Sequence, residues 1–196
     1  MEENWKLLGK LGILVIPNFL PPALCHRIIS SSYAADGYAA TVGDESRVDT
    51  QIRSTRVVPI QEGVRSELFQ TFDDLQPQLA NFFGCELVGR EAPQLLRYLE
   101  GDFFRIHQDR HAESKGEIAK RLVTTVTFVN DPMDGTYPYA GGDLRLYGLF
   151  DNPALADAGL PVKAAQGLLI AFRPDTLHEV TPVSRGQRYT LTTWYH

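Results

Sequence analysis

The first third of the chain carries two groups of apolar residues, each closed by residues that end regular structure. An apolar run over residues 11–19 predicts a buried strand that closes at Pro17. Pro21 and Pro22 predict the start of a helix to about Ala35, because the first turn of a helix has N–H groups without intrahelical partners. The residues of this helix that we expect to face inward are Leu24, Ile28 and Ile29.

A second helix is expected over residues 63–83, ended by Gly84. Its apolar residues recur at intervals of four and three, as they do on one buried face of a helix. The predicted stripe consists of Leu68, Phe72, Leu75, Leu79 and Phe82. Between the two helices, residues 36–56 are polar and rich in Gly, Ser and Thr, with a strand expected near Arg53. A loop of this length in a small domain is either functional or disordered, and we interpret it as a candidate lid over a substrate site.

The second half of the chain has the pattern of a β protein. Short runs rich in Val, Leu, Thr, Tyr and Phe are separated by turn residues, which predicts antiparallel sheets packed as a sandwich or barrel. The runs are 94–99, 103–108, 121–129, 142–148, 167–172, 178–183 and 187–195. We therefore expect a mainly β (α+β) fold in one domain over residues 1–196. Helical support would occupy about 1–90 and the β core about 91–196.

Composition and charge limit the partners of such a domain. A length of 196 residues with 43% hydrophobic and 22% charged residues suits one globular domain. The net charge is −5 and no run of Lys or Arg forms a stripe, so neither nucleic acid nor an anionic membrane surface is expected as a partner. The remaining substrates are peptides, proteins and small molecules; the sequence does not predict an oligomeric state.

The cysteines and the first residues of the chain predict a cytoplasmic protein. Cys25 and Cys85 are isolated, without the spacing of a disulfide framework or a zinc knuckle, and are expected to be buried thiols in a reducing compartment. The chain begins with an acidic Met-Glu-Glu, unlike a secretory signal, and no apolar run is long enough to span a membrane.

Two histidines and one aspartate are candidate metal ligands. His107 and Asp109 lie two residues apart at the end of an apolar run, where strand side chains share a face. His178 opens another strand after a tight turn at residues 173–176. A lone His-x-Asp is more often a hydrogen-bonded structural pair. With His178, the set is the ligand set of non-haem Fe(II), although Zn(II) takes the same ligand types.

Arg188 is a candidate anion-binding residue in the last strand. Period-two alternation places Arg188, Thr190, Thr192 and Trp194 on one face of that strand. Burying an arginine is costly unless an anion meets it, and a guanidinium binds a carboxylate through two hydrogen bonds. The alternatives are a surface arginine or an internal salt bridge.

Together these segments resemble the prolyl-hydroxylase-like branch of the Fe(II)/2-oxoglutarate-dependent oxygenases. The resemblance runs from about Glu91 to the C-terminus and rests on the order and spacing of six segments. They are Leu96-Arg97-Tyr98 with Gly101, His107-Gln108-Asp109, residues 121–130, residues 141–144, residues 167–172, and His178-Glu179-Val180 through Arg188 to Trp194.

The resemblance implies a double-stranded β-helix, or jelly roll, with N-terminal helices packed on one sheet. It implies that His107, Asp109 and His178 hold Fe(II), with 2-oxoglutarate as cosubstrate, O2 as oxidant and ascorbate as an optional accessory reductant. The residues assigned to the cosubstrate are Arg188, Tyr98, Trp194 and Thr190, with Arg188 on the distal carboxylate. Tyr98 is as well explained as a packed core residue, and His111 is only a minor candidate for the site.

Departures from the family pattern refine these expectations. Oxygen-sensing animal relatives carry a tyrosine where Phe128 stands, so hydrogen bonds to the cosubstrate must differ in this chain. Collagen-type relatives carry a lysine at the position of Arg188, which places this chain nearer the oxygen-sensing and bacterial branch. Halogenating relatives replace the carboxylate that corresponds to Asp109, so hydroxylation is favoured.

The expected reaction is hydroxylation of an unactivated C–H bond, with release of succinate and CO2. The substrate that the resemblance favours is a prolyl residue of a peptide or protein. The alternatives are a free amino acid or small metabolite as substrate, a catalytically silent jelly roll that binds a ligand, and a zinc hydrolase. Residues 36–56 and 131–140 show no family match from which a substrate could be named.

Overall fold

The computed structural model describes residues 2–42, 47–132, 135–152, 155 and 157–196. Within these ranges the helices are α1 (Glu2–Lys10), α2 (Pro22–Ser32), α3 (Glu62–Phe83) and α4 (Gly116–Lys120). The strands of the first half are β1 (Leu14–Ile16), β2 (Tyr38–Ala39), β3 (Arg53–Ser54), β4 (Arg56–Val58), β5 (Gln94–Tyr98) and β6 (Phe103–His107). The later strands are β7 (Val123–Phe128), β8 (Tyr139–Gly141), β9 (Leu144–Leu146), β10 (Leu160–Pro161), β11 (Leu169–Phe172), β12 (His178–Val180), β13 (Val183–Gly186) and β14 (Arg188–Tyr195).

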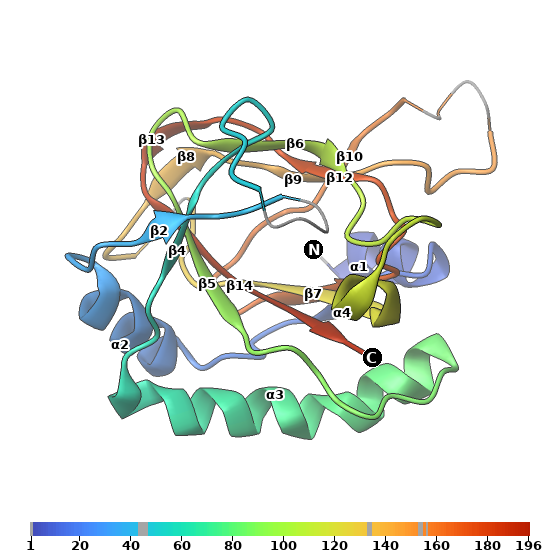
Figure 1. Cartoon of the computed structure of the whole chain (residues 1–196), viewed down its shortest axis with the longest axis horizontal. Helices are drawn as coiled ribbons and strands as arrows, with labels where there is room; N and C mark the ends of the chain where they lie inside the picture. The colour runs from blue at the N-terminus through green and yellow to red at the C-terminus, as the bar shows by residue number, and fades with distance from the viewer. Residues whose placement is uncertain (1, 43–46, 133–134, 153–154, 156) are drawn as a thin grey trace.

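The strands form two main sheets and a short ribbon, in a mainly β jelly roll. The larger sheet has the order β1-β11-β7-β14-β5-β4-β2 and the smaller one β10-β9-β12-β6-β3, while β13 pairs with β8. Each of the strand pairs in the described part of the chain is antiparallel. In Figure 1, α3 lies below the larger sheet and the smaller sheet lies above it. The expected class, β sheets with helices packed on one sheet, is confirmed.

Two apolar cores follow from this layering. One joins α2 and α3 to the outer face of the larger sheet, through residues such as Ile28, Phe72 and Leu191. The other fills the space between the two sheets, with Phe128 and Ile170 from the larger sheet and Leu146 from the smaller one. Strand β14 contributes alternate residues to opposite sides, as its period-two pattern predicts, because Tyr189, Leu191 and Tyr195 belong to the helix-facing core.

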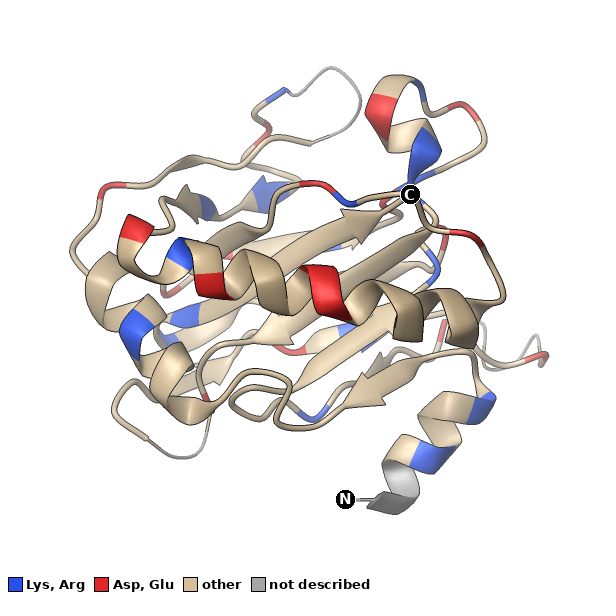
Figure 2. Cartoon of the chain, turned by 90° about the horizontal axis from the view of Figure 1, so that it is seen from below, with Lys and Arg blue, Asp and Glu red and all other residues tan. Residues whose placement is uncertain are grey.

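The helix α3 follows the predicted stripe except at its last turn. Figure 2 shows this helix lying across the outer face of the larger sheet. The first four stripe residues are buried, but Phe82 is 37% exposed and Phe83 is buried instead. The prediction for Phe82 is wrong because the interval of four that joins Leu75 and Leu79 continues to Phe83. Gly84 ends the helix in the left-handed conformation, with φ of 60°.

The N-terminal segment differs most from its expectation. The strand expected over 11–19 is reduced to β1, Leu14–Ile16, because Gly12 has a φ of 78° and makes a turn that closes helix α1. Helix α1 itself was not predicted, so three helices rather than two precede the β core. The helix that begins after Pro21 ends at Ser32, and its expected inward residues Leu24, Ile28 and Ile29 are buried.

The predicted strands of the second half are present but shorter, and the run 178–183 divides between β12 and β13. No pattern in the sequence predicted β8, β10 or α4. The strand expected near Arg53 is β3; residues 43–46 of the 36–56 segment and 133–134 of the 131–140 segment lie outside the described residues. Cys25 is buried with its pKa raised to about 12, Cys85 is only partly buried, and both are free thiols. None of the described helices is long and apolar enough to cross a membrane.

Candidate metal and cosubstrate site

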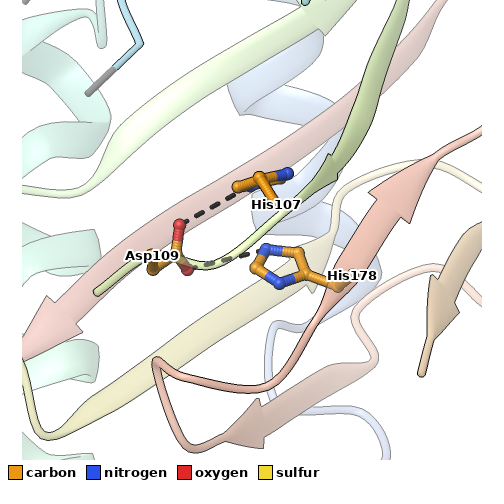
Figure 3. A group of neighbouring side chains, drawn as sticks. All are labelled: His107, Asp109 and His178. Atoms are coloured by element: carbon orange, nitrogen blue, oxygen red, sulfur yellow. Dashed lines mark ion pairs between the residues drawn. The ribbon is translucent and has the colours of Figure 1, made fainter. Parts of the chain in front are cut away.

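Strands β6 and β12 bring the two candidate histidines together. The strands pair antiparallel in the smaller sheet, and His107 is the register partner of His178. Asp109 follows the end of β6, and its backbone N–H donates to the Pro174 carbonyl at 2.8 Å. The turn before β12 is closed by a hydrogen bond from Thr176 N to Arg173 O of 2.9 Å, as the sequence predicted. The three side chains therefore converge from two neighbouring strand ends (Figure 3).

Both imidazoles are oriented by the same local device. Nδ1 of His107 lies 2.8 Å from the Arg105 carbonyl oxygen, and Nδ1 of His178 lies 2.8 Å from the Thr176 carbonyl oxygen. A carbonyl oxygen only accepts, so each Nδ1 carries the proton and each Nε2 presents its lone pair. Nε2 of His107 lies 3.7 Å and Nε2 of His178 3.6 Å from the carboxylate oxygens of Asp109. A hydrogen bond that fixes the tautomer in this way is typical of histidines that bind metals.

Asp109 is held as a carboxylate. Although burial alone would raise the pKa of Asp109, the imidazoles of His178 and His107 and the hydrogen bond from Thr124 lower it below its usual value. The Thr124 hydroxyl donates to Oδ2 at 2.8 Å. One ligand atom from each of the three residues lies within 4.8 Å of the others, so the group can hold one ion. Two nitrogens and one carboxylate oxygen, clustered on one side, suit a divalent transition metal such as Fe(II).

The protonation of His107 has a consequence for stability without metal. Burial, and then the nearby His178, lower the pKa of His107 from 6.5 to about 3. Because this folded pKa lies below the unfolded one, the unfolded chain binds more protons as the pH falls. Because of His107, the unfolding free energy of the metal-free protein should be about 2 kcal/mol lower at pH 5 than at pH 7.

Chemical denaturation at both pH values measures this effect. Between pH 7 and pH 5 the unfolding free energy of His107→Gln should fall by about 2 kcal/mol less than that of the wild type, because the glutamine at position 107 does not titrate. Asp109 does not disturb the comparison, because its lowered pKa concerns a more acidic range. Equal losses in the two proteins would show that His107 is not buried in the neutral form.

Arg188 lies in the interior beside this group. Its side chain is 0% exposed, and Nη1 donates to the Thr190 hydroxyl at 3.4 Å. Nε and Nη2 have no hydrogen-bond partner among the described residues. The guanidinium carbon lies 5.0 Å from the ring centre of Tyr98 and 5.3 Å from that of Phe128. Surface exposure and an internal salt bridge, the two alternatives for this arginine, are therefore both wrong.

One cavity of about 580 Å³ joins the metal ligands to Arg188. The residues predicted for the site all line it: His107, Asp109, His178, Tyr98, Arg188, Thr190 and Trp194. The minor candidate His111 also lines it, but its imidazole is half exposed and pairs with Glu113 at 3.3 Å. Thr41 and Val42 of the 36–56 segment contribute to the wall, whereas none of the described residues of 131–140 does.

Trp194 is part of a support for Asp109 that the sequence did not reveal. The Arg121 guanidinium stacks on the indole ring, 3.8 Å from its centre, and pairs with Glu91 through Nε at 2.6 Å. Nη1 of Arg121 also donates to the backbone carbonyl of Asp109 at 3.2 Å. The pair thus fixes both the indole and the metal-binding loop. A tight Arg–Glu pair between distant segments leaves no local signal in a sequence.

Arg53 was also missed as a site residue. It lies on β3, is 9% exposed and lines the cavity, with its guanidinium carbon 4.5 Å from the ring centre of Phe104. That ring stacks on His107 with centroids 3.5 Å apart. Nη1 donates to the Thr41 carbonyl at 2.9 Å, while Nε has no partner among the described residues. The cavity therefore has two cationic walls, one at Arg188 and one at Arg53.

Fold and site together define a class: a jelly roll with a clustered His-Asp-His set and a buried arginine in the same cavity, as expected of a mononuclear non-haem iron enzyme. A model of the 2OG-Fe(II) oxygenase superfamily matches residues 93–196, more than half of the chain. The chain belongs to this superfamily. It is therefore an oxidoreductase of a family that uses Fe(II), 2-oxoglutarate and O2.

Individual relatives agree with this assignment. A PKHD-type hydroxylase of Cupriavidus metallidurans is 28% identical over 193 residues, covering 93% of this chain and 77% of that protein. A PKHD-type hydroxylase of Sphingopyxis alaskensis is 34% identical over 124 residues, covering 62% and 51%.

Solved structures show the same fold. A Pseudomonas putida prolyl-4-hydroxylase superposes with a TM-score of 0.69 at 24% identity, covering 97% of this chain and 95% of that one. A Trichoplax adhaerens prolyl hydroxylase, in complex with a hypoxia inducible factor oxygen degradation domain peptide, gives 0.72 at 19% identity, covering 99% and 90%.

Proposed function

We propose that this protein is a hydroxylase that holds Fe(II) through His107, Asp109 and His178 and acts on a prolyl residue of a peptide or protein. The observation that carries the proposal is the single cavity that joins these ligands to a fully buried, incompletely bonded arginine. A metal ligand set and a carboxylate-binding cation in one cavity suit a cosubstrate that is a 2-oxo acid at one end and a carboxylate at the other.

The residues divide the work between metal and cosubstrate. When bound, Fe(II) and 2-oxoglutarate supply the oxidising chemistry, in which O2 decarboxylates the cosubstrate to succinate and CO2 and a C–H bond becomes C–OH. Arg188 binds the distal carboxylate and so fixes how deeply the cosubstrate enters; Thr190 orients that guanidinium through its 3.4 Å hydrogen bond. Tyr98 and Trp194 form walls of the same cavity. Leu96, Val126 and Leu144 line it with apolar surface that excludes water.

The peptide substrate is supported by the relatives and by the cavity wall. The named relatives are PKHD-type and prolyl hydroxylases, and one of the similar structures holds a peptide. In this chain Arg53 offers an unpaired donor on a wall near His107, where a substrate carbonyl group would find a partner. The cytoplasmic location remains a prediction from the sequence.

The cavity does not favour a zinc hydrolase. Such an enzyme needs a general base beside the metal. Apart from Asp109, the carboxylates among the described lining residues are Glu91, paired with Arg121 at 2.6 Å, and Glu117, paired with Lys120 at 2.6 Å. Neither is free to take a proton from a metal-bound water.

Anaerobic reconstitution tests the proposal. Protein loaded with Fe(II) and 2-oxoglutarate should form succinate on exposure to O2, and faster with a proline-containing peptide that gains one oxygen atom by mass spectrometry. Free proline and other free amino acids form the parallel screen. Turnover of free amino acids alone would replace the peptide by a small metabolite as substrate. If no substrate gave iron-dependent succinate formation, the result would support the alternative of a catalytically silent jelly roll that binds a ligand.

A further inference from the structure

A buried tyrosine beside Arg188 has no role in the site as described so far. Tyr139 lies on β8 and is 2% exposed, and its hydroxyl has no hydrogen-bond partner among the described residues. Burial raises the pKa of the Tyr139 hydroxyl, and the positive charge of Arg188 opposes that rise. The hydroxyl is therefore neutral at physiological pH and adjoins the guanidinium.

The backbone fixes this neighbourhood. Tyr139 is the register partner of Gly186 in the β8–β13 ribbon, two residues before Arg188 in the chain. The segment after Tyr139 then passes against the stem of the arginine, since a Cβ atom at Gly142 would lie only 2.7 Å from the Arg188 Cδ atom. Gly142 also has a φ of 64°, which favours glycine. The position of Tyr139 beside the guanidinium is thus built into the main chain.

Arg188 and Tyr139 both have buried polar atoms without hydrogen-bond partners among the described residues. Nε and Nη2 of Arg188 and the Tyr139 hydroxyl all lack partners within the described part of the chain, and the first two can only donate. Phe128, whose ring lies 5.3 Å from the guanidinium carbon, offers no oxygen. Unsatisfied buried donors are costly, and they are tolerated where a ligand completes them. An acceptor with several lone pairs on two oxygens, a carboxylate, would complete both groups.

We propose that the Tyr139 hydroxyl donates a hydrogen bond to the distal carboxylate of 2-oxoglutarate, the same group that Arg188 binds. The inference rests on the proposed function, in which that carboxylate lies at Arg188. Tyr139 and Arg188 together then select a dicarboxylic 2-oxo acid over a monocarboxylic one of equal length. This assigns a cosubstrate contact to β8, a strand that no sequence pattern predicted.

The variant Tyr139→Phe tests this role by direct binding. Calorimetry on the Mn(II)-loaded protein, which does not turn over, compares 2-oxoglutarate with 2-oxovalerate, which has the same chain length without the distal carboxylate. Loss of one hydrogen bond to a charged group should weaken 2-oxoglutarate about tenfold or more and leave 2-oxovalerate within about twofold. The matched control is Tyr147→Phe, whose hydroxyl donates a hydrogen bond to the Glu179 carboxylate; it should change neither.

Several outcomes would overturn the inference. Unchanged 2-oxoglutarate affinity in Tyr139→Phe would show that the Tyr139 hydroxyl donates no hydrogen bond to the cosubstrate. An equal loss of affinity for both oxo acids would show that the hydroxyl shapes the pocket and does not bind the distal carboxylate. A lower melting temperature of the ligand-free variant would likewise indicate a structural hydroxyl, since the proposal leaves it unpaired there. If Arg188→Met also leaves 2-oxoglutarate affinity intact, the carboxylate position itself is wrong; if only Tyr139→Phe does, the error is confined to Tyr139.

Discussion

The variant His178→Ala is expected to abolish measurable turnover. The alanine removes one of three ligand atoms that lie within 4.8 Å of one another and leaves His107 and Asp109 without the third. Metal affinity should fall by more than the roughly 10–100-fold that is typical when an outer-shell partner of a metal ligand is lost. Iron-dependent succinate formation and calorimetric titration with Mn(II) measure the two effects separately.

The matched control for this variant is His26→Ala. His26 is an exposed histidine on α2 that contacts Tyr137 and does not line the cavity. It should retain both metal affinity and turnover. Wild-type metal affinity in His178→Ala would contradict the ligand assignment, whatever happened to turnover.

The variant Arg188→Met should lose 2-oxoglutarate binding while keeping, or gaining, stability. In the ligand-free protein Arg188 is a fully buried cation with Nε and Nη2 unpaired, so an apolar side chain of similar length removes an uncompensated charge. In the complex the same change leaves the distal carboxylate buried without its cation. Affinity for 2-oxoglutarate should fall on the order of 100-fold or more.

Thermal unfolding with and without cosubstrate separates these effects. The ligand-free variant should unfold at or above the wild-type temperature, and 2-oxoglutarate should no longer raise it, since a ligand stabilises only the state that it binds. Arg185→Met is the control, because Arg185 is an exposed arginine on the neighbouring strand β13. If 2-oxoglutarate still stabilised Arg188→Met as much as it stabilises the wild type, the assignment of Arg188 to the distal carboxylate would be refuted.

The pattern of the chain determined those features that depend on local periodicity. The i, i+2 spacing placed His107 and Asp109 on one side of a strand end, and alternation along β14 placed Arg188 and Trp194 in the cavity. The interval of four and three along α3 predicted its buried face up to the last turn, where Phe83 replaces Phe82. These features follow from covalent geometry, which repeats along any helix or strand.

Only the tertiary structure decided which distant residues meet. The register between β6 and β12 sets His178 opposite His107, and the β8–β13 ribbon brings Tyr139 to Arg188. Pairing register and the burial of Arg53 depend on contacts between segments far apart in the chain, which local sequence patterns do not encode. Short strands such as β8 and β10 were missed for the same reason, because three and two residues carry no period and are stabilised by their neighbours in space.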